Sequence, residues 1–146
     1  MSMNGNELMI GDWVKINDVD YTTPVQIDCI VKKHGTVYAY FAEFDIRVAC
    51  EKLQGIPLTA DLLGKNGFYP LYDDKSAYKL FWSDEKEEIY WSITIDLTHP
   101  IASRIENHIM RTGRKTENWE MKGCVYFVHE LQHLMRQFRI DKEIVN

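Results

Sequence analysis

The chain has 146 residues, of which 45% are hydrophobic and 12% aromatic, and this composition supports a folded core and argues against disorder. The formal net charge is −5, and the excess of acidic residues lies in residues 1–98, which disfavours nucleic acid and anionic membrane surfaces as partners. The N-terminal residues are polar, and no apolar run approaches the ~18 residues of a membrane span, so we expect a cytoplasmic protein with no membrane partner.

The three cysteines, Cys29, Cys50 and Cys124, are odd in number and widely spaced. No C-x-x-C pair is present, so the pattern indicates neither a disulfide framework nor a zinc ribbon. Because each has apolar neighbours, we expect buried free thiols in a reducing compartment.

Residues 7–50 read as a run of short strands. Apolar side chains recur with a two-residue period over residues 8–16, 25–32, 36–41 and 45–50, and turns are expected at Gly11-Asp12 and His34-Gly35. Short strands joined by tight turns predict a small antiparallel β-barrel of the SH3-like kind, which we place in a first domain of residues 1–54.

Small barrels of this kind often bind peptides or nucleic acid through exposed aromatic side chains. The candidates for such a surface are Tyr21, Tyr38, Tyr40 and Phe44. The alternative is that they are ordinary strand residues covered by the rest of the chain, since strands are enriched in aromatic residues.

The remaining residues, 55–146, are expected to form an α+β portion. Thr59 is a good N-cap for a short helix over residues 60–65, which Asn66-Gly67 would end. Residues 78–82 and 89–97 predict a β-hairpin with a charged loop. Residues 99–122 fit either a helix between Pro100 and Gly113 or a second hairpin.

Residues 125–138 carry the strongest helical pattern in the chain. At about 100° per residue, the apolar side chains form one continuous stripe centred on Leu131. His129 and His133, four residues apart, lie together on the face nearly opposite that stripe. The pattern therefore predicts a helix that packs by its Leu131 face and turns both imidazoles toward solvent or a partner.

The segment His129-Glu130-Leu131-Gln132-His133 matches the H-E-x-x-H motif, in which two histidines bind zinc and the glutamate acts as base. A catalytic zinc needs a third protein ligand, which the known arrangements place downstream. Only thirteen residues follow His133, and they contain no histidine and no glycine. We therefore expect no catalytic residue, metal or cofactor, and keep zinc with His129, His133 and Glu130 as the alternative.

Four segments resemble, in the same order, a family of short uncharacterised proteins from Bacteroides-type gut bacteria and their phages or mobile elements. They are N-E-L-M-I-G-D-W-V (residues 6–14), G-I-P-L-T with L-L-x-x-x-G-F (55–68), Y-K-L (78–80) and V-H-E-L-Q-H-L (128–134). In this family the closing segment usually reads V-H-x-L-Q-N-L, so asparagine stands where this chain has His133. The resemblance implies a cytoplasmic accessory protein of phage or mobile-element origin, and it implies no activity.

Taken together, these features predict an α+β protein with a small N-terminal SH3-like barrel, a β-hairpin and a packed C-terminal helix. The function expected is that of a non-enzymatic binding or accessory protein with a protein partner. A zinc-dependent hydrolase that uses the H-E-L-Q-H stretch is the alternative.

Overall fold

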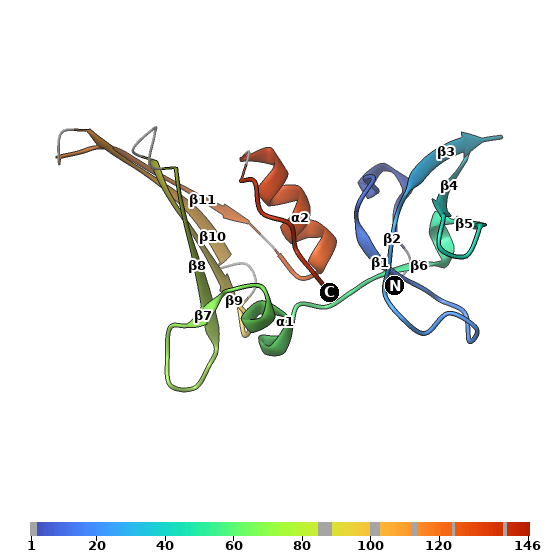
Figure 1. Ribbon diagram of the computed structural model, residues 1–146, viewed down its shortest axis with the longest axis horizontal. Coiled ribbons are helices and arrows are strands. Elements are labelled where there is room, and N and C mark those ends of the chain that lie inside the picture. The colour runs from blue at the N-terminus through green and yellow to red at the C-terminus, as the bar shows by residue number, and fades with distance from the viewer. Residues whose placement is uncertain (1–2, 85–88, 100–102, 112–113, 124, 139) are drawn as a thin grey trace. The chain divides into compact units, whose positions relative to one another are not determined.

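The computed structural model describes residues 3–84, 89–99, 103–111, 114–123, 125–138 and 140–146 (Figure 1). Its strands form antiparallel sheets, and helices accompany them, so the protein is mixed α+β as expected. The chain divides into two compact units, one of Met1–Pro57, Phe127–Ile144 and Asn146, and the other of Leu58–Tyr126 and Val145. The domain boundary expected after residue 54 stays a prediction.

The first unit contains two three-stranded antiparallel sheets. In one, β1 (Trp13–Ile16) lies between β2 (Val25–Gln26) and β6 (Leu53–Gly55). In the other, β4 (Thr36–Phe41) lies between β3 (Cys29–Lys33) and β5 (Ile46–Ala49). Short 3-10 helices, η1 (Gly5–Glu7) and η2 (Cys50–Lys52), complete this part. Over these described residues the ladders do not close into a barrel, and the SH3-like barrel stays a prediction.

The core of the first unit comes from alternate residues of these strands. Side chains on one face of β1, β4 and β6 are buried, among them Val14, Ile16, Ala39, Phe41 and Leu53, whereas those of β3 are partly buried or exposed. The single strand expected over residues 25–32 is divided, because the backbone N–H of Ile27 donates to Asp12 and that of Asp28 donates to Tyr40. The chain thus passes from one sheet to the other at this point.

One expectation about the cysteines is wrong. Cys29 is exposed, because its side chain lies on the outward face of β3, and Cys50 is only partly buried. Cys124 lies outside the described residues.

The second unit is built on a five-stranded antiparallel sheet. Its strands lie in the order β11 (Arg114–Gly123), β10 (Ser103–Arg111), β9 (Ile89–Asp96), β8 (Ala77–Asp84) and β7 (Tyr69–Pro70). The helix α1 (Ala60–Lys65) has the bounds that the sequence predicts. Thr59 caps it by accepting the N–H of Leu62, and Gly67 follows it with a φ of 86°.

The expected hairpin is β8–β9, and its loop at residues 85–88 lies outside the described part. For residues 99–122 the hairpin alternative is confirmed and the helix is wrong, since β10 pairs with both β9 and β11. Ile105 and Ile109 are four residues apart, a spacing that suits one face of a helix and one face of a strand equally. Pairing on both sides satisfies the backbone of β10 and decides in favour of the strand.

The last helix, α2, spans Val128–Gln137 and belongs to the first unit. Leu131, Val128 and Met135 are buried, so the prediction that the Leu131 face packs is confirmed. The prediction for the opposite face is wrong, because His129 is only 4% exposed and Gln132 only 7%. Among the described residues, α1 and α2 are both far shorter than a helix that crosses a bilayer.

Candidate functional site

The polar face of α2 meets the turn that precedes β1. Gly11 has a φ of 88°, which favours glycine, and this conformation brings Asp12 back toward Met9. The N–H of Asp12 donates to the Met9 carbonyl over 3.1 Å, and the N–H of Met9 donates to the Asp12 Oδ2 atom over 2.8 Å. These bonds fix a carboxylate whose side chain is 0% exposed.

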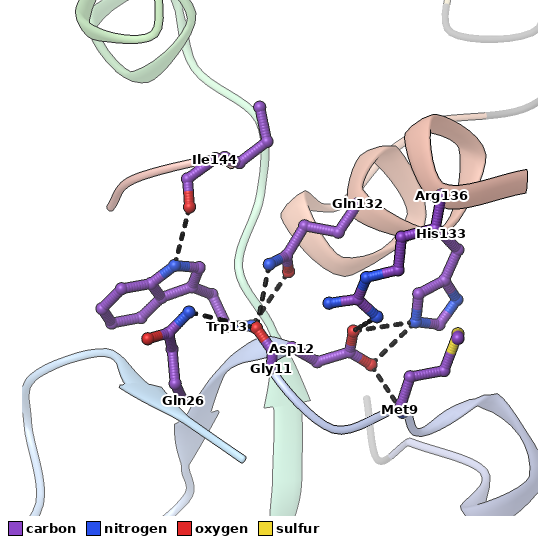
Figure 2. A network of polar contacts seen from close by, with 9 residues as sticks. All are labelled: Met9, Gly11, Asp12, Trp13, Gln26, Gln132, His133, Arg136 and Ile144. Atoms are coloured by element: carbon purple, nitrogen blue, oxygen red, sulfur yellow. Dashed lines mark hydrogen bonds and ion pairs between the residues drawn. The ribbon is translucent and has the colours of Figure 1, made fainter. Parts of the chain in front are cut away.

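Two side chains of α2 reach this carboxylate, as Figure 2 shows. The Nε2 atom of His133 lies 2.9 Å from Oδ1 and 2.8 Å from Oδ2 of Asp12. The Nη1 atom of Arg136 donates to Oδ1 over 3.2 Å. Because His133 and Arg136 are three residues apart, they lie on one face of the helix and both reach the same buried acid. The acid is thereby paired rather than buried alone, which would be costly.

Gln132 bonds the backbone on both sides of Asp12. Its Nε2 atom donates to the Gly11 carbonyl over 3.0 Å, and its Oε1 atom accepts the N–H of Trp13 over 2.9 Å. One side-chain amide thus supplies the donor and the acceptor that a neighbouring strand would supply at the start of β1. The Nε1 atom of Trp13 in turn donates to the Ile144 carbonyl over 2.9 Å.

We call Asp12, Gln132, His133 and Arg136, with the backbone of Gly11 and Trp13, the α2 clasp. The first motif histidine lies beside it. The His129 ring stacks on Phe127 with centroids 5.7 Å apart, and its centroid lies 5.7 Å from that of His133. Its Nδ1 atom is buried without a hydrogen-bond partner among the described residues.

Burial lowers the pKa of His129 below its ordinary value of 6.5. The carboxylates of Asp12, Glu130 and Glu7 act in the opposite direction, and His133 adds to the lowering. Burial has the largest effect, so the neutral imidazole is favoured.

Glu130, the base in the zinc alternative, has a different contact. Its Oε1 atom accepts the N–H of Phe127 over 3.0 Å at the start of α2. A carboxylate in this position satisfies a free backbone donor and interacts favourably with the N-terminal end of the helix. Glu130 therefore has a structural contact at the helix start.

The contacts of the motif residues bear on the zinc alternative. A catalytic zinc needs three protein ligands, and the described part of the chain holds no group of three or more His, Cys, Asp or Glu side chains placed to bind a metal. The Nε2 atom of His133 is directed at Asp12, and the Oε1 atom of Glu130 at the Phe127 backbone. The rings of His129 and His133 are close together, as the motif predicts, and the Nε2 atom of His133 contacts Asp12.

The four aromatic candidates fall into two pairs. Tyr21 and Phe44 meet edge to face with centroids 5.0 Å apart, and both pack against the core of the first unit. Tyr38 and Tyr40 lie on the face of β4 opposite the buried Ala39 and are partly exposed.

The Tyr40 hydroxyl donates to Asp45 Oδ1 over 2.8 Å. This hydrogen bond is the main reason that the pKa of Tyr40 is raised. Tyr40 is thus held in place by a neighbouring carboxylate on the outer side of the sheet.

Sequence reasoning missed Asp12, Gln132 and Arg136 as partners. The spacing of residues 129, 132, 133 and 136 was the available signal, because it places four polar side chains on one helix face. An acid in a Gly-Asp turn is a natural partner for a His and an Arg on such a face.

Models of known protein families, curated proteins and solved structures were compared with the chain, and none of them matches.

Proposed function

We propose that the chain is a non-enzymatic binding or accessory protein, in which the H-E-L-Q-H segment joins its C-terminal helix to its N-terminal sheets. The observation that carries this proposal is the contact of His133 with the buried Asp12, at 2.8 and 2.9 Å. A histidine whose Nε2 atom is directed at a buried carboxylate contributes to folding, and only its Nδ1 atom is left for a further contact.

The other motif residues support the same proposal. Glu130 contacts the backbone at the helix start, and Gln132 bonds the backbone of Gly11 and Trp13. Three polar residues of one short segment thus have partners within the first unit. These contacts stabilise the first unit, so we propose that the binding surface lies elsewhere on the chain.

For that surface we propose the outward face of β4 with Tyr38 and Tyr40, together with the partly buried pair Tyr21 and Phe44. Partly exposed aromatic side chains on a sheet are common anchors in protein interfaces. The partner proposed is a protein, because the acidic chain disfavours nucleic acid. The strand pattern adds the proposal of an SH3-like barrel, and the family resemblance adds those of a cytoplasmic location and a phage or mobile-element origin.

The zinc question is tested on untagged protein purified without chelator. We expect a zinc content far below one per chain by mass spectrometry, and the same unfolding midpoint with and without EDTA. The proposal is overturned by stoichiometric zinc together with peptide hydrolysis that Glu130→Gln abolishes.

The binding part is tested by affinity purification from cells that express the chain. We expect a stoichiometric protein partner that is lost with the double substitution Tyr38→Ala and Tyr40→Ala. Tyr72→Ala is the matched control, because Tyr72 is an exposed tyrosine of the second unit. Purification without any partner, or equal capture by all variants, contradicts the proposed surface.

The zinc-dependent hydrolase is the second candidate, and one observation favours it. The Nδ1 atom of His129 is buried without a partner among the described residues, as a ligand without its metal would be. The competing explanation is a packing constraint: Phe127 and His129 stack against Gly55, where an added Cβ would lie 2.8 Å from the Phe127 ring. Zinc added to the wild-type protein and to His129→Gln distinguishes the two.

A further inference from the structure

The first unit contains a cavity of about 250 Å³ beside the α2 clasp. It lies between the last turn of α2, the turn before β1 and the C-terminal residues 140–144. Met135, Ile140 and Ile144 line it and are buried, so they provide an apolar floor. A cavity of this size is smaller than the roughly 300–1,000 Å³ of sites for drug-sized ligands, and it suits a molecule of the size of benzoate or hexanoate.

The polar wall of the cavity offers donors, and two of its acceptors are already occupied. The Gly11 carbonyl accepts from both Gln132 and Gln26, at 3.0 and 3.2 Å. The Oε1 atom of Gln132 accepts the N–H of Trp13. Each side-chain amide nitrogen carries two hydrogens, so Gln26 and Gln132 each keep one N–H beyond the bond to Gly11.

Arg136 adds a positive charge to the same wall. Its Nη1 atom donates to Asp12, and its Nη2 atom approaches Gly11 so closely that an added Cβ there would lie 3.0 Å away. A guanidinium has five N–H donors, and one contact with Asp12 leaves others available. The side chain is about one-third exposed, so a ligand in the cavity can reach it.

From this balance of donors and acceptors we propose that the cavity binds a small monocarboxylate. The carboxylate would accept from Arg136 and from the remaining N–H groups of Gln26 and Gln132, and a short apolar tail would lie on the floor. Lys142 adds a second positive charge to the lining, and the two exposed acids beside it, Asp141 and Glu143, disfavour a dianion such as phosphate more than a monoanion. This site is separate from the proposed protein-binding face of β4, so either proposal can fail without the other.

The test is a titration of the full chain with hexanoate and with benzoate, followed by nuclear magnetic resonance of side-chain amides and indoles. We expect saturable shifts of the Gln26 and Gln132 amides and of the Trp13 indole. Hexanamide and benzamide keep the shape but lack the charge, and they should bind at least about tenfold more weakly than the acids. Inorganic phosphate should give no saturable shift.

Two substitutions at Gln26 locate the site without changing any side chain of the clasp. Gln26→Glu places a negative charge on the wall and should weaken hexanoate binding by about tenfold or more relative to Gln26→Leu. Arg136→Gln should also weaken it, whereas Arg47→Gln, at an exposed arginine of β5, should not. Lack of saturation at about 10 mM hexanoate, equal binding of the amides, or equal affinity of the two Gln26 variants would overturn the proposal.

Discussion

Replacing Asp12 with alanine should destabilise the first unit more than any other single change at a polar residue of the clasp. Asp12 is the only clasp side chain that is 0% exposed, and its carboxylate accepts from His133, Arg136 and the backbone of Met9. The substitution removes the acceptor and leaves three donors without it. Because two of those donors belong to α2, the helix loses its attachment to the turn before β1.

The size of the effect follows from the exposure of the partners. A hydrogen bond to a charged group contributes roughly 1.5–3 kcal/mol when both groups are buried. The side chains of His133 and Arg136 are 26% and 37% exposed, so water partly replaces the lost bonds and each loss is about 1 kcal/mol. With a similar loss at the Met9 N–H, the free energy of unfolding should fall by about 3 kcal/mol.

The measurement is urea unfolding at neutral pH, followed through the indole N–H resonance of Trp13. This group donates to the Ile144 carbonyl, so it reports on the first unit specifically. Asp28→Ala is the control, because the Asp28 carboxylate also accepts a backbone N–H, from Ala42 over 2.7 Å, but is exposed. We expect a loss below about 1 kcal/mol for that control.

A second test separates the clasp from a local effect on the turn. If Asp12 and Arg136 interact as described, Asp12→Ala should cost about 1 kcal/mol less in an Arg136→Ala background than in the wild type. The reasoning is refuted if Asp12→Ala unfolds at the wild-type urea concentration, or if the two substitutions are fully additive.

Three further predictions concern α2 and its neighbours. Glu130→Ala should lower the free energy of unfolding by about 1 kcal/mol through loss of the bond to the Phe127 N–H, and Glu130→Gln should keep most of it, as urea unfolding of both will show. Gly55→Ala should destabilise the protein by roughly 1–3 kcal/mol, because its Cβ would lie 2.8 Å from the Phe127 ring. Gly64→Ala in α1 would place a Cβ with nothing within 4 Å and should stabilise the protein by roughly 0.5–1 kcal/mol, and thermal melts of both variants will show this. Burial lowers the pKa of His129 below 6.5, so the contribution of the neutral ring to stability is complete above pH 6.5 and is lost as the pH falls through the lowered pKa. Between about pH 7 and pH 5, the urea midpoint of His129→Gln should therefore fall less than that of the wild type.

Much of the local structure could be predicted because local signals determine it. The helix at residues 60–65 was defined by a capping threonine before it and Asn66-Gly67 after it, and its bounds are those predicted. The strand at residues 36–41 follows a two-residue period and was also correct in both bounds. Cap residues and turn residues act on their immediate neighbours, so their effect is visible in a short stretch of sequence.

Long-range pairing was harder, and the strands of residues 25–33 illustrate why. One alternating pattern covers the whole stretch, yet the chain leaves one sheet and enters the other between Gln26 and Cys29. At this point the N–H of Ile27 donates to Asp12, before β1, and the N–H of Asp28 donates to Tyr40 in β4. Periodicity tells which face of a strand is apolar, and it does not tell which strand lies beside it.

The error about the histidine face has a more general cause. Hydrophobic periodicity detects burial only where burial is driven by apolar side chains, and it located the Leu131 face correctly. The opposite face is buried for a different reason, because Gln132 and His133 satisfy polar groups of Gly11, Asp12 and Trp13. These partners are separated by 119 to 121 positions in the chain, so no local window contains both sides. A polar helix face is therefore predicted to be exposed whenever its partner is distant in sequence. In this chain the two histidines of the last helix match a metal motif, because the sequence near them does not contain Asp12, the acid that His133 contacts.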